Sequence, residues 1–331
     1  MPDHGITLSE SKKILYLTRF KGELIKPCPG TKEYICCGYR ILHIGTNCPI
    51  DCTYCILQAY FNQPYTRLFV NTDDLFNQLR IYVRDHAGEI LRLGTGEFTD
   101  SLAWDQLTGF SRLLLRELSG YPNVVVELKT KTAAVDNLLQ MDPPKNVILS
   151  WSLNPQEIIG KEERGAASLI SRLEAARICR QKGYYLGFHF DPIFAFPGWE
   201  EAYRKTLETL FSFISPEGIV WISLGCFRFI PTLKPIIQDR SPASRYIYQE
   251  FIPALDKKMR YIQSVRVEIY QNMLQWIRQY GQAVTVYLCM ENSSVWDKVC
   301  GFIPGEGYPT LTEMLDQRVM TLGLVEGRRD V

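Results

Sequence analysis

The feature that most constrains the fold is an alternation, from residue 40 onward, of short apolar runs with longer amphipathic runs. The apolar runs predict six strands: "RILHIG" (40–45), "EILRLG" (89–94), "VVVELK" (124–129), "VILSWSL" (147–153), "YLGFHF" (185–190) and "IVWISLG" (219–225). The amphipathic runs predict helices over 73–86, 102–118, 132–140, 167–182 and 199–213. Strand–helix units in succession form a parallel sheet with right-handed crossovers. We therefore expect an α/β fold, either open or curled into a partial barrel.

The rest of the chain predicts extensions of this core. A polar, cysteine-bearing segment covers residues 1–39, and the core is expected over 40–240. Residues 241–331 are expected to pack on the barrel, with helix over 241–280 apart from a break at Pro253 and a last strand in "AVTVYLCM". With 331 residues the chain is long enough to bury a sizeable core.

Composition and charge narrow the class of protein. The net charge is +1, from 37 basic and 36 acidic residues, which differs from a strongly basic nucleic-acid binder. The longest apolar runs reach about half of the roughly 20 residues that a membrane span needs. The first residues, "MPDHGITLSESKK", carry no apolar signal-peptide core. We expect a cytoplasmic protein without a membrane partner.

Three cysteines lie close together in "TNCPIDCTYC", residues 46–55, as Cys48, Cys52 and Cys55. A structural zinc site takes four ligands, usually from paired C-x2-C knuckles, and this loop has one knuckle and no histidine. Iron–sulfur clusters are normally held by four thiolates, so three thiolates leave one iron of a 4Fe–4S cluster open to another ligand. The spacing favours such a cluster over zinc or chance.

The loops that follow the predicted strands carry the remaining polar and glycine-rich motifs. In a parallel barrel the loops after the strands gather at one mouth. We expect the cysteine loop to share that mouth with "GTGEFTD" (94–100), "KTK" (129–131), "SLNP" (152–155), "HFDP" (189–192) and "GCFRF" (225–229).

C-x3-C-x2-C after the first strand of such a fold resembles the signature of the radical S-adenosylmethionine (SAM) enzymes. Two longer stretches, "CTYCILQAYFNQPYTRLFVNTDDLFNQL" and "LISRLEAARICRQKGYYLGFHFDPIFAFPGWEEAYRK", are similar to the spore photoproduct lyase family, and the resemblance spans roughly residues 40–230. It implies a partial (β/α)6 TIM-type barrel with N- and C-terminal extensions. It also implies a lyase that holds a 4Fe–4S cluster and SAM and receives electrons from a flavodoxin- or ferredoxin-type reductant. Such an enzyme forms a 5′-deoxyadenosyl radical and repairs a thymine photolesion in DNA.

The resemblance also assigns site residues. Gly94, Gly96 and Glu97 match the element that receives the cofactor's ammonium group, and Lys131 matches a lysine that binds its carboxylate. Ser152 and Asn154 match a ribose contact, His189 and Asp191 are expected to line the cofactor cavity, and Tyr54 is the aromatic residue before the last cluster cysteine. The alternatives are a glycine-rich turn with a solvated glutamate, a surface lysine and a structural His–Asp arrangement.

Two positions depart from the family. Glu97 stands where the family has a cysteine that returns hydrogen to the product radical, and Ile56 stands where it has a tyrosine. A carboxylate cannot replace a thiol as a hydrogen-atom donor, because its O–H bond is too strong. Either another thiol acts, with Cys226 after the sixth strand as the candidate, or the later chemistry or the substrate differs. Cys226 could equally be a small buried apolar residue.

A second group of cysteines lies outside the triplet. Cys28, Cys36 and Cys37 could hold a second 4Fe–4S cluster, with Cys289 or Cys300 as the fourth ligand, or they could be incidental thiols. Adjacent cysteines do not readily form a disulfide with each other. Six of the ten cysteines lie between Cys28 and Cys55, and such clustering in a reducing compartment is more typical of metal than of disulfides.

The expected DNA contact is a basic run interleaved with aromatic residues. Phosphate contacts and base stacking would come from Arg228, Lys234, Arg240, Arg245, Lys257, Lys258 and Arg260, with Phe227, Phe229, Tyr246 and Tyr248. A solvated helical face explains the charges equally well. Two other functions stay open: a radical SAM enzyme on another nucleotide, peptide or small molecule, and a non-catalytic iron–sulfur or zinc protein that binds nucleic acid.

Overall fold

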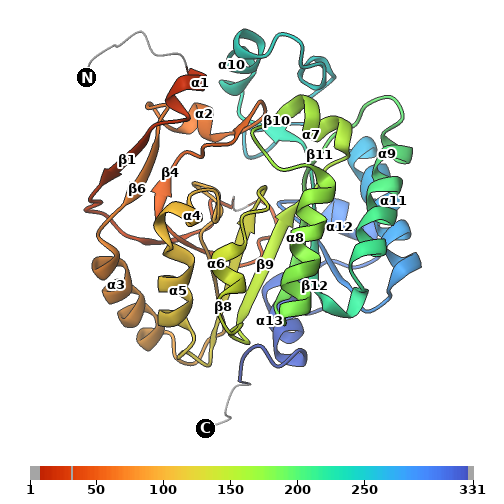
Figure 1. Ribbon diagram of the computed structural model, residues 1–331. Coiled ribbons are helices and arrows are strands. Elements are labelled where there is room, and N and C mark those ends of the chain that lie inside the picture. The colour runs from red at the N-terminus through yellow and green to blue at the C-terminus, as the bar shows by residue number, and fades with distance from the viewer. Residues whose placement is uncertain (1–7, 31–32, 327–331) are drawn as a thin grey trace.

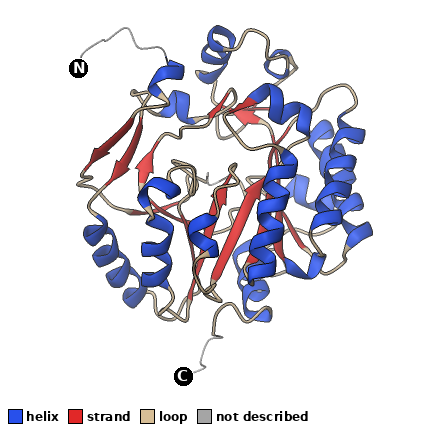
Figure 2. Cartoon of the chain, in the orientation of Figure 1, coloured by secondary structure: helices blue, strands red, loops and turns tan. Residues whose placement is uncertain are grey.

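The computed structural model describes residues 8–30 and 33–326, and its main element is an eight-stranded sheet (Figures 1 and 2). The strands in spatial order are β16 (Thr285–Leu288), β12 (Ile219–Cys226), β11 (Tyr185–Ile193), β9 (Val147–Ser152), β8 (Val124–Thr130), β7 (Leu91–Gly94), β3 (Arg40–Leu42) and β2 (Ile25–Pro27). All neighbours pair in parallel except β2 and β3. The six predicted strands and the partial barrel are confirmed.

The core strands are buried on both faces, which explains why their sequences are continuously apolar rather than alternating. Every residue of β7 and β12 is buried, as are all but one in β8 and in β9. Figure 1 shows the helices that connect the strands on the outer side of the curved sheet. Their apolar faces close the core from that side, which leaves the strand ends free to carry polar side chains.

The connecting helices follow the predicted pattern with local changes. They are α3 (Thr72–Asp85), α4 (Asp105–Thr108), α5 (Phe110–Leu118), α6 (Asp136–Leu139), α7 (Gln156–Glu162), α8 (Leu169–Lys182) and α9 (Trp199–Phe213). Helix α8 begins at Ser168, whose side chain accepts a hydrogen bond from the Ser171 N–H, and ends at Gly183 with φ +116°. The helix expected over 102–118 is divided in two, because Gly109 adopts a left-handed conformation with φ +59°.

Residues outside 40–240 complete the main sheet. Strand β2, from the N-terminal segment, lies at one edge, and β16, from the C-terminal segment, lies at the other. Both expected extensions therefore contribute strands to the sheet of the core. The boundaries at 39/40 and 240/241 stay a prediction about the arrangement of the chain.

The expected helix over 241–280 is correct only for its second half. Helix α11 (Gln263–Tyr280) is present, but β14 (Ile252–Pro253) and β15 (Met259–Arg260) form a hairpin before it, paired with β13 (Arg228–Phe229). The turn between the two strands contains Lys257 with φ +60°, a conformation that a helix cannot accommodate. Pro253 lies in the edge strand, where a missing N–H is tolerated.

Short elements surround the barrel mouth. Two small sheets combine β1 (Leu15–Thr18), β6 (Thr66–Phe69) and β4 (Gly45–Thr46), and β5 (Asp51–Cys52) with β10 (Glu163–Arg164). The remaining helices are α1 (Leu8–Ser11), α2 (Leu57–Tyr60), η1 (Pro216–Gly218), α10 (Leu233–Arg240), η2 (Tyr246–Tyr248), α12 (Ser293–Cys300) and α13 (Leu311–Thr321). Across the described part of the chain, every helix is too short or too polar to cross a bilayer.

Candidate active site

A cavity of about 340 Å³ opens at the ends of the parallel strands, as expected for a barrel of this kind. Its wall includes residues from the cysteine loop and from the loops after β7, β8, β9, β11 and β12. Its volume lies in the range of small-molecule sites. The predicted site residues that line it are Cys48, Cys52, Tyr54, Cys55, Gly96, Glu97, Lys131, Ser152, His189 and Asp191.

The cysteine loop is held in place by hydrogen bonds to its backbone. The Lys12 ammonium donates to the Cys48 carbonyl at 3.0 Å, and the Gln58 amide donates to the Cys52 and Thr53 carbonyls at 3.0 and 2.9 Å. Strand β5 pairs Cys52 with Glu163 of β10. The three thiols therefore face the cavity from a backbone that is fixed on several sides.

The donor set fits an iron–sulfur cluster better than a single ion. Within residues 8–30 and 33–326, no three His, Cys, Asp or Glu side chains converge closely enough to hold one metal ion. Each iron of a 4Fe–4S cluster takes its own thiolate, so the Cys48, Cys52 and Cys55 sulfurs need not meet at one point. Burial raises the pKa of Cys48 and of Cys52, so their thiolates need a cationic partner to persist in this wall.

Beside the triplet, a buried polar network surrounds Glu163. Its carboxylate forms an ion pair with Arg172 and accepts hydrogen bonds from the Tyr54 hydroxyl and, at 3.0 Å, from the Asn154 amide. Burial opposes ionisation of Glu163, but the Arg172 and Lys131 charges outweigh it and lower its pKa. Tyr54 thus presents its ring to the cavity while its hydroxyl is committed to the protein.

Lys131 and Glu97 are placed differently, although both line the cavity. The Lys131 ammonium lies 6.0 Å from the Tyr54 ring centroid, and within the described residues it has no carboxylate at ion-pair distance. Glu97 forms an ion pair with Lys129. Lys131 is therefore available to an anionic group of a ligand, whereas Glu97 is already neutralised by the protein.

The two glycines of "GTGEFTD" are required by packing within the protein. A Cβ on Gly94 would lie 1.8 Å from the Tyr39 hydroxyl, and one on Gly96 would lie 2.7 Å from the Lys129 Cβ. Gly94 is buried in β7 and is not part of the cavity wall. The expectation that Gly94 approaches a cofactor is therefore not supported, because the space beside it is filled by Tyr39.

The Ser152–Asn154 pair is divided by the structure. Ser152 lines the cavity, and its carbonyl accepts from Arg172 at 2.8 Å. Asn154 is buried away from the cavity wall, where it donates to Glu163 and accepts from the Tyr203 hydroxyl at 2.8 Å. The expected ribose contact of Asn154 stays a prediction that this geometry does not favour, because both ends of its amide are occupied by the protein.

His189 and Glu127 form the floor of the cavity. The Glu127 carboxylate contacts His189 Nε2 at 2.8 Å and accepts from Ser150 at 2.6 Å and from the Trp221 indole at 2.9 Å. Burial raises the pKa of Glu127, but the His189 charge and the hydrogen bonds to the carboxylate outweigh it and lower that pKa to about 2. His189 is thus oriented from below by an ionised glutamate.

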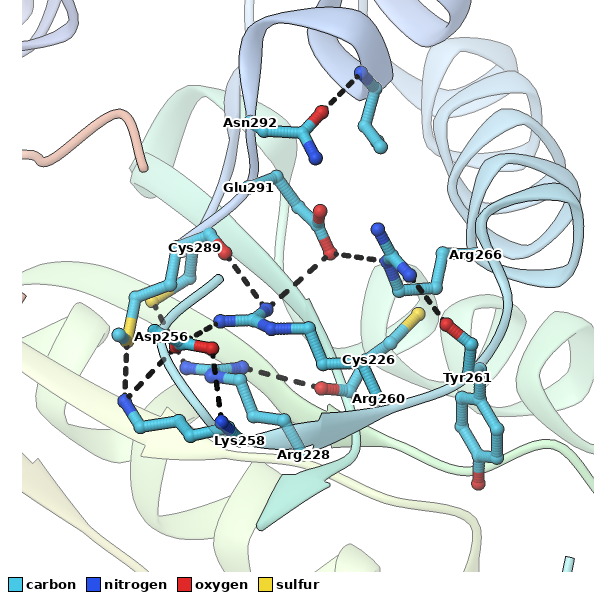
Figure 3. Close-up of polar contacts among 12 residues, drawn as sticks. Cys226, Arg228, Asp256, Lys258, Arg260, Tyr261, Arg266, Cys289, Glu291 and Asn292 are labelled. Carbon is cyan, nitrogen blue, oxygen red and sulfur yellow. Dashed lines mark hydrogen bonds and ion pairs between the residues drawn. The ribbon is translucent and has the colours of Figure 1, made fainter. Parts of the chain in front are cut away.

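Asp191 and Cys226 lie on different sides of the last strands. Arg228 donates two hydrogen bonds of 3.0 Å to Asp191 and contacts the Cys289 sulfur at 3.6 Å. In the view of Figure 3, Cys226 and Cys289 lie on opposite sides of the Arg260 guanidinium. Cys226 is buried outside the cavity wall and interacts with Tyr270 and Glu291. The role of Cys226 as hydrogen donor stays a prediction that this geometry does not favour, because its thiol lies on the α11 side, outside the cavity wall.

Most of the basic and aromatic run is also committed to the protein. Arg240 pairs with Asp51, Arg260 pairs with Asp256, and Phe227, Phe229 and Tyr246 pack in a buried aromatic cluster. Phe229 and Tyr246 lie outside the cavity wall and cannot stack on a base there, whereas Phe227 also lines the cavity. Among the other expected contacts, Tyr248 is exposed, and Lys258 and Arg228 line the cavity.

Comparison with known proteins places this fold and site in one family. The profile of the family described as spore photoproduct lyase matches residues 35–279. Two curated relatives, both spore photoproduct lyases, are similar: one from Geobacillus sp. (strain Y412MC61) is 30% identical over 207 residues, and one from Bacillus subtilis (strain 168) is 29% identical over 205 residues. Each match covers 61% of this chain and 60% of the relative, so the chain spans about 60% of the length of these relatives.

Solved structures give a longer match. A cysteine-to-alanine variant of spore photoproduct lyase superposes with a TM-score of 0.77 at 25% identity, covering 85% of this chain and 84% of that one. A spore photoproduct lyase complexed with dinucleoside spore photoproduct gives a TM-score of 0.75 at 25% identity over the same shares. The chain belongs to the spore photoproduct lyase family.

Several residues of the site were missed by the sequence reasoning. Glu127 lies within β8, and Glu163 follows α7 as the first residue of β10. Lys129 was passed over in favour of Lys131 in the same "KTK". Asp100 accepts hydrogen bonds from the N–H groups of Leu102, Ala103 and Lys131 and so fixes two cavity loops. An acidic residue inside an apolar strand, as in "VVVELK", was the one available signal for Glu127.

Proposed function

We propose that this chain is a radical SAM lyase that repairs a thymine photolesion of the spore photoproduct type in DNA. The observation that carries the proposal is the set of three thiols, Cys48, Cys52 and Cys55, on the wall of a cavity built by the strand ends. The family membership supports it, and so do relatives solved with bound AdoMet and dinucleoside spore photoproduct. Cys48, Cys52 and Cys55 would hold a 4Fe–4S cluster, which together with SAM would supply the radical chemistry for hydrogen abstraction from the substrate.

In this proposal, residues of the cavity wall bind SAM and orient the substrate. Lys131 binds the carboxylate of SAM, since its ammonium lies on the same cavity wall as the triplet and has no protein carboxylate at ion-pair distance in the described residues. Ser152 contributes a hydroxyl on the same wall. His189, held by Glu127 from below, donates or accepts a hydrogen bond at the cavity floor. Pro192, Phe227 and Tyr287 give the wall an apolar part that excludes water from the radical.

The reductant and the compartment are part of the proposal. A flavodoxin- or ferredoxin-type protein is the one-electron donor that such a cluster requires. All ten cysteines are free thiols, as expected in the cytoplasm, where thiols are kept reduced.

One observation favours a second candidate function, a radical SAM enzyme that acts on a different substrate. Glu97 is ion-paired with Lys129 at the place where the resemblance implies a hydrogen-donating cysteine. A substrate that needs no hydrogen return at that position would fit this wall as well.

Incubation with a defined lesion separates the two candidates. The anaerobic, reduced protein is supplied with SAM and dinucleoside spore photoproduct, and thymidine release is followed by chromatography. Lesion loss that requires SAM and is abolished in Cys52→Ala supports repair. Intact lesion alongside SAM cleavage would remove the repair function and leave the second candidate.

A further inference from the structure

Four cysteines outside the triplet lie where the N-terminal segment contacts the segment that follows the last strand of the sheet. The chain leaves β2 at Pro27, and the segment that leads to β3 reaches across to the opposite edge of the sheet. There the Ile35 N–H donates to the Glu291 carbonyl at 3.0 Å in an isolated antiparallel bridge just beyond β16. This connection brings the N-terminal segment against the segment that follows the last strand.

The positions of the four cysteines follow this closure. Cys28 comes directly after β2, Cys36 and Cys37 follow the bridging Ile35, and Cys289 comes directly after β16. Cys28, Cys37 and Cys289 line the same cavity as the triplet, whereas Cys36 is exposed. Three separate segments of the chain thus deliver four thiols to one place.

The four thiols interact with one another in every combination, by a hydrogen bond or electrostatically. Cys36 hydrogen-bonds to Cys37 and interacts electrostatically with Cys28 and Cys289. Cys28 interacts with Cys37, and Cys289 interacts with both of them. All six pairs therefore interact. Cys179 and Cys300, which also lie outside the triplet, do not interact with any of these four thiols.

The surroundings of the sulfurs are shaped for them. A Cβ on Gly30 would lie 3.2 Å from the Cys36 sulfur, so a side chain there would press on it. Gly38, with φ +73°, turns its N–H toward the same sulfur at 3.5 Å, and Arg228 directs a guanidinium N–H to the Cys289 sulfur at 3.6 Å. N–H donors to sulfur are among the interactions that tune iron–sulfur clusters.

The donor set selects the class of cofactor. Four thiols without histidine suit zinc or an iron–sulfur cluster. Within the described residues, however, no three of these side chains converge as a single ion requires, and the same holds for the triplet. Each iron of a 4Fe–4S cluster takes its own thiolate, so four thiols need not meet at one point to hold it. Disulfide formation is disfavoured for the adjacent Cys36 and Cys37.

We propose that Cys28, Cys36, Cys37 and Cys289 hold a second 4Fe–4S cluster, facing the triplet across the cavity and reaching the surface at Cys36. This site rests on the geometry of the four thiols and stands independently of the substrate. It is closed by protein ligands, in contrast to the triplet, which leaves one iron open to SAM.

Metal content tests the proposal. The full-length protein is reconstituted anaerobically with iron and sulfide, and iron, sulfide and zinc are measured per chain. We expect about eight irons in the wild type and about four in either the C48A/C52A/C55A variant or the C28A/C289A variant. The C179A/C300A variant removes two cysteines outside both sets and is expected to keep about eight.

Spectroscopy assigns the remaining cluster in each variant. In electron paramagnetic resonance, the reduced C48A/C52A/C55A variant is expected to keep a signal that SAM does not change. The reduced C28A/C289A variant is expected to keep a signal that SAM does change. If C28A/C289A fails to fold, the C48A/C52A/C55A variant alone tests the second cluster. Iron retained in that variant supports the second cluster, and complete loss of iron contradicts it.

Two results would overturn the second cluster. One is about four irons in the wild type that disappear entirely in C48A/C52A/C55A. The other is zinc in place of iron in that variant. Both outcomes would leave the function proposed for the triplet intact, whereas absence of iron from the triplet with retention in the second set would contradict that function instead.

Discussion

Arg228 holds Asp191 through two hydrogen bonds of 3.0 Å, so that the loop after β12 is tied to the end of β11 at the wall of the cavity. Burial lowers the pKa of the guanidinium, but the Asp191 charge outweighs it and raises that pKa well above its usual value. The pair is thus ionised, and each partner satisfies the other.

Asp191→Asn is expected to destabilise the protein, because it leaves the largely buried Arg228, whose side chain is 13% exposed, without a counter-charge. The expected loss in the free energy of unfolding is on the order of 3 kcal/mol. Chemical denaturation measures it, with Glu201→Gln as the control, since Glu201 pairs with Arg204 at the surface and its loss should cost less than about 1 kcal/mol. Equal losses in the two variants would contradict the buried pair.

Lys131→Met is expected to raise the KM for SAM by roughly 10- to 100-fold, because it removes a charged hydrogen-bond donor. Lys131→Arg should recover part of the loss, and Lys161→Met, a surface lysine, serves as the control. The kinetics of SAM cleavage give KM and kcat separately. An unchanged KM in Lys131→Met would show that the carboxylate binds elsewhere.

Asn154→Ala is expected to lower stability without altering SAM binding. It leaves the Tyr203 hydroxyl without an acceptor and removes one of the two hydrogen bonds to Glu163 Oε1, at a cost of about 1–3 kcal/mol. Thermal unfolding measures the first effect, and the KM for SAM measures the second. A stable variant with a raised KM would restore the ribose contact that the sequence predicted.

The buried position of His43 leads us to expect a loss of stability in mild acid. Its ring is packed by Phe20, Phe69 and Phe98, with centroids 4.8–5.0 Å away, and within the described residues neither ring nitrogen has a hydrogen-bond partner. Burial, aided by the Lys26 charge, lowers the pKa of His43 from 6.5 to about 4.

The folded state therefore prefers the neutral ring, whereas the unfolded chain takes up a proton below pH 6.5. Stability from this group is complete above pH 6.5 and is lost progressively as the pH falls toward 4. His43→Phe should reduce the fall in melting temperature over this interval. The same acid-dependent fall in both proteins would show that other groups cause it.

Periodicity and cysteine spacing predicted much of the fold and the position of the triplet. Strands buried on both faces, such as β9 and β12, read as continuous apolar runs, and Gly183 marked the end of α8. The hairpin of β14 and β15 was missed because its strands are two residues long and its turn depends on Lys257 and on the Asp256–Arg260 ion pair.

The site was harder to predict than the fold, because its partners are distant in sequence. Nothing near Asn154 indicates that Glu163 and Tyr203 occupy its amide, and nothing near Gly94 indicates that Tyr39 fills the space beside it. The orientation of Cys226 depends on β12 and α11 packing together. Motifs thus located the cavity, while tertiary packing decided which side chains face it.

The most direct test of the account is the formation of 5′-deoxyadenosine by the reduced, anaerobic protein. With SAM supplied, the wild type is predicted to release 5′-deoxyadenosine and methionine in equal amounts, and Cys48→Ala, Cys52→Ala and Cys55→Ala are each predicted to release none. The Cys300→Ala variant, which alters a thiol outside both sets, should match the wild type. Absence of 5′-deoxyadenosine from a wild-type protein that carries its iron would contradict the account.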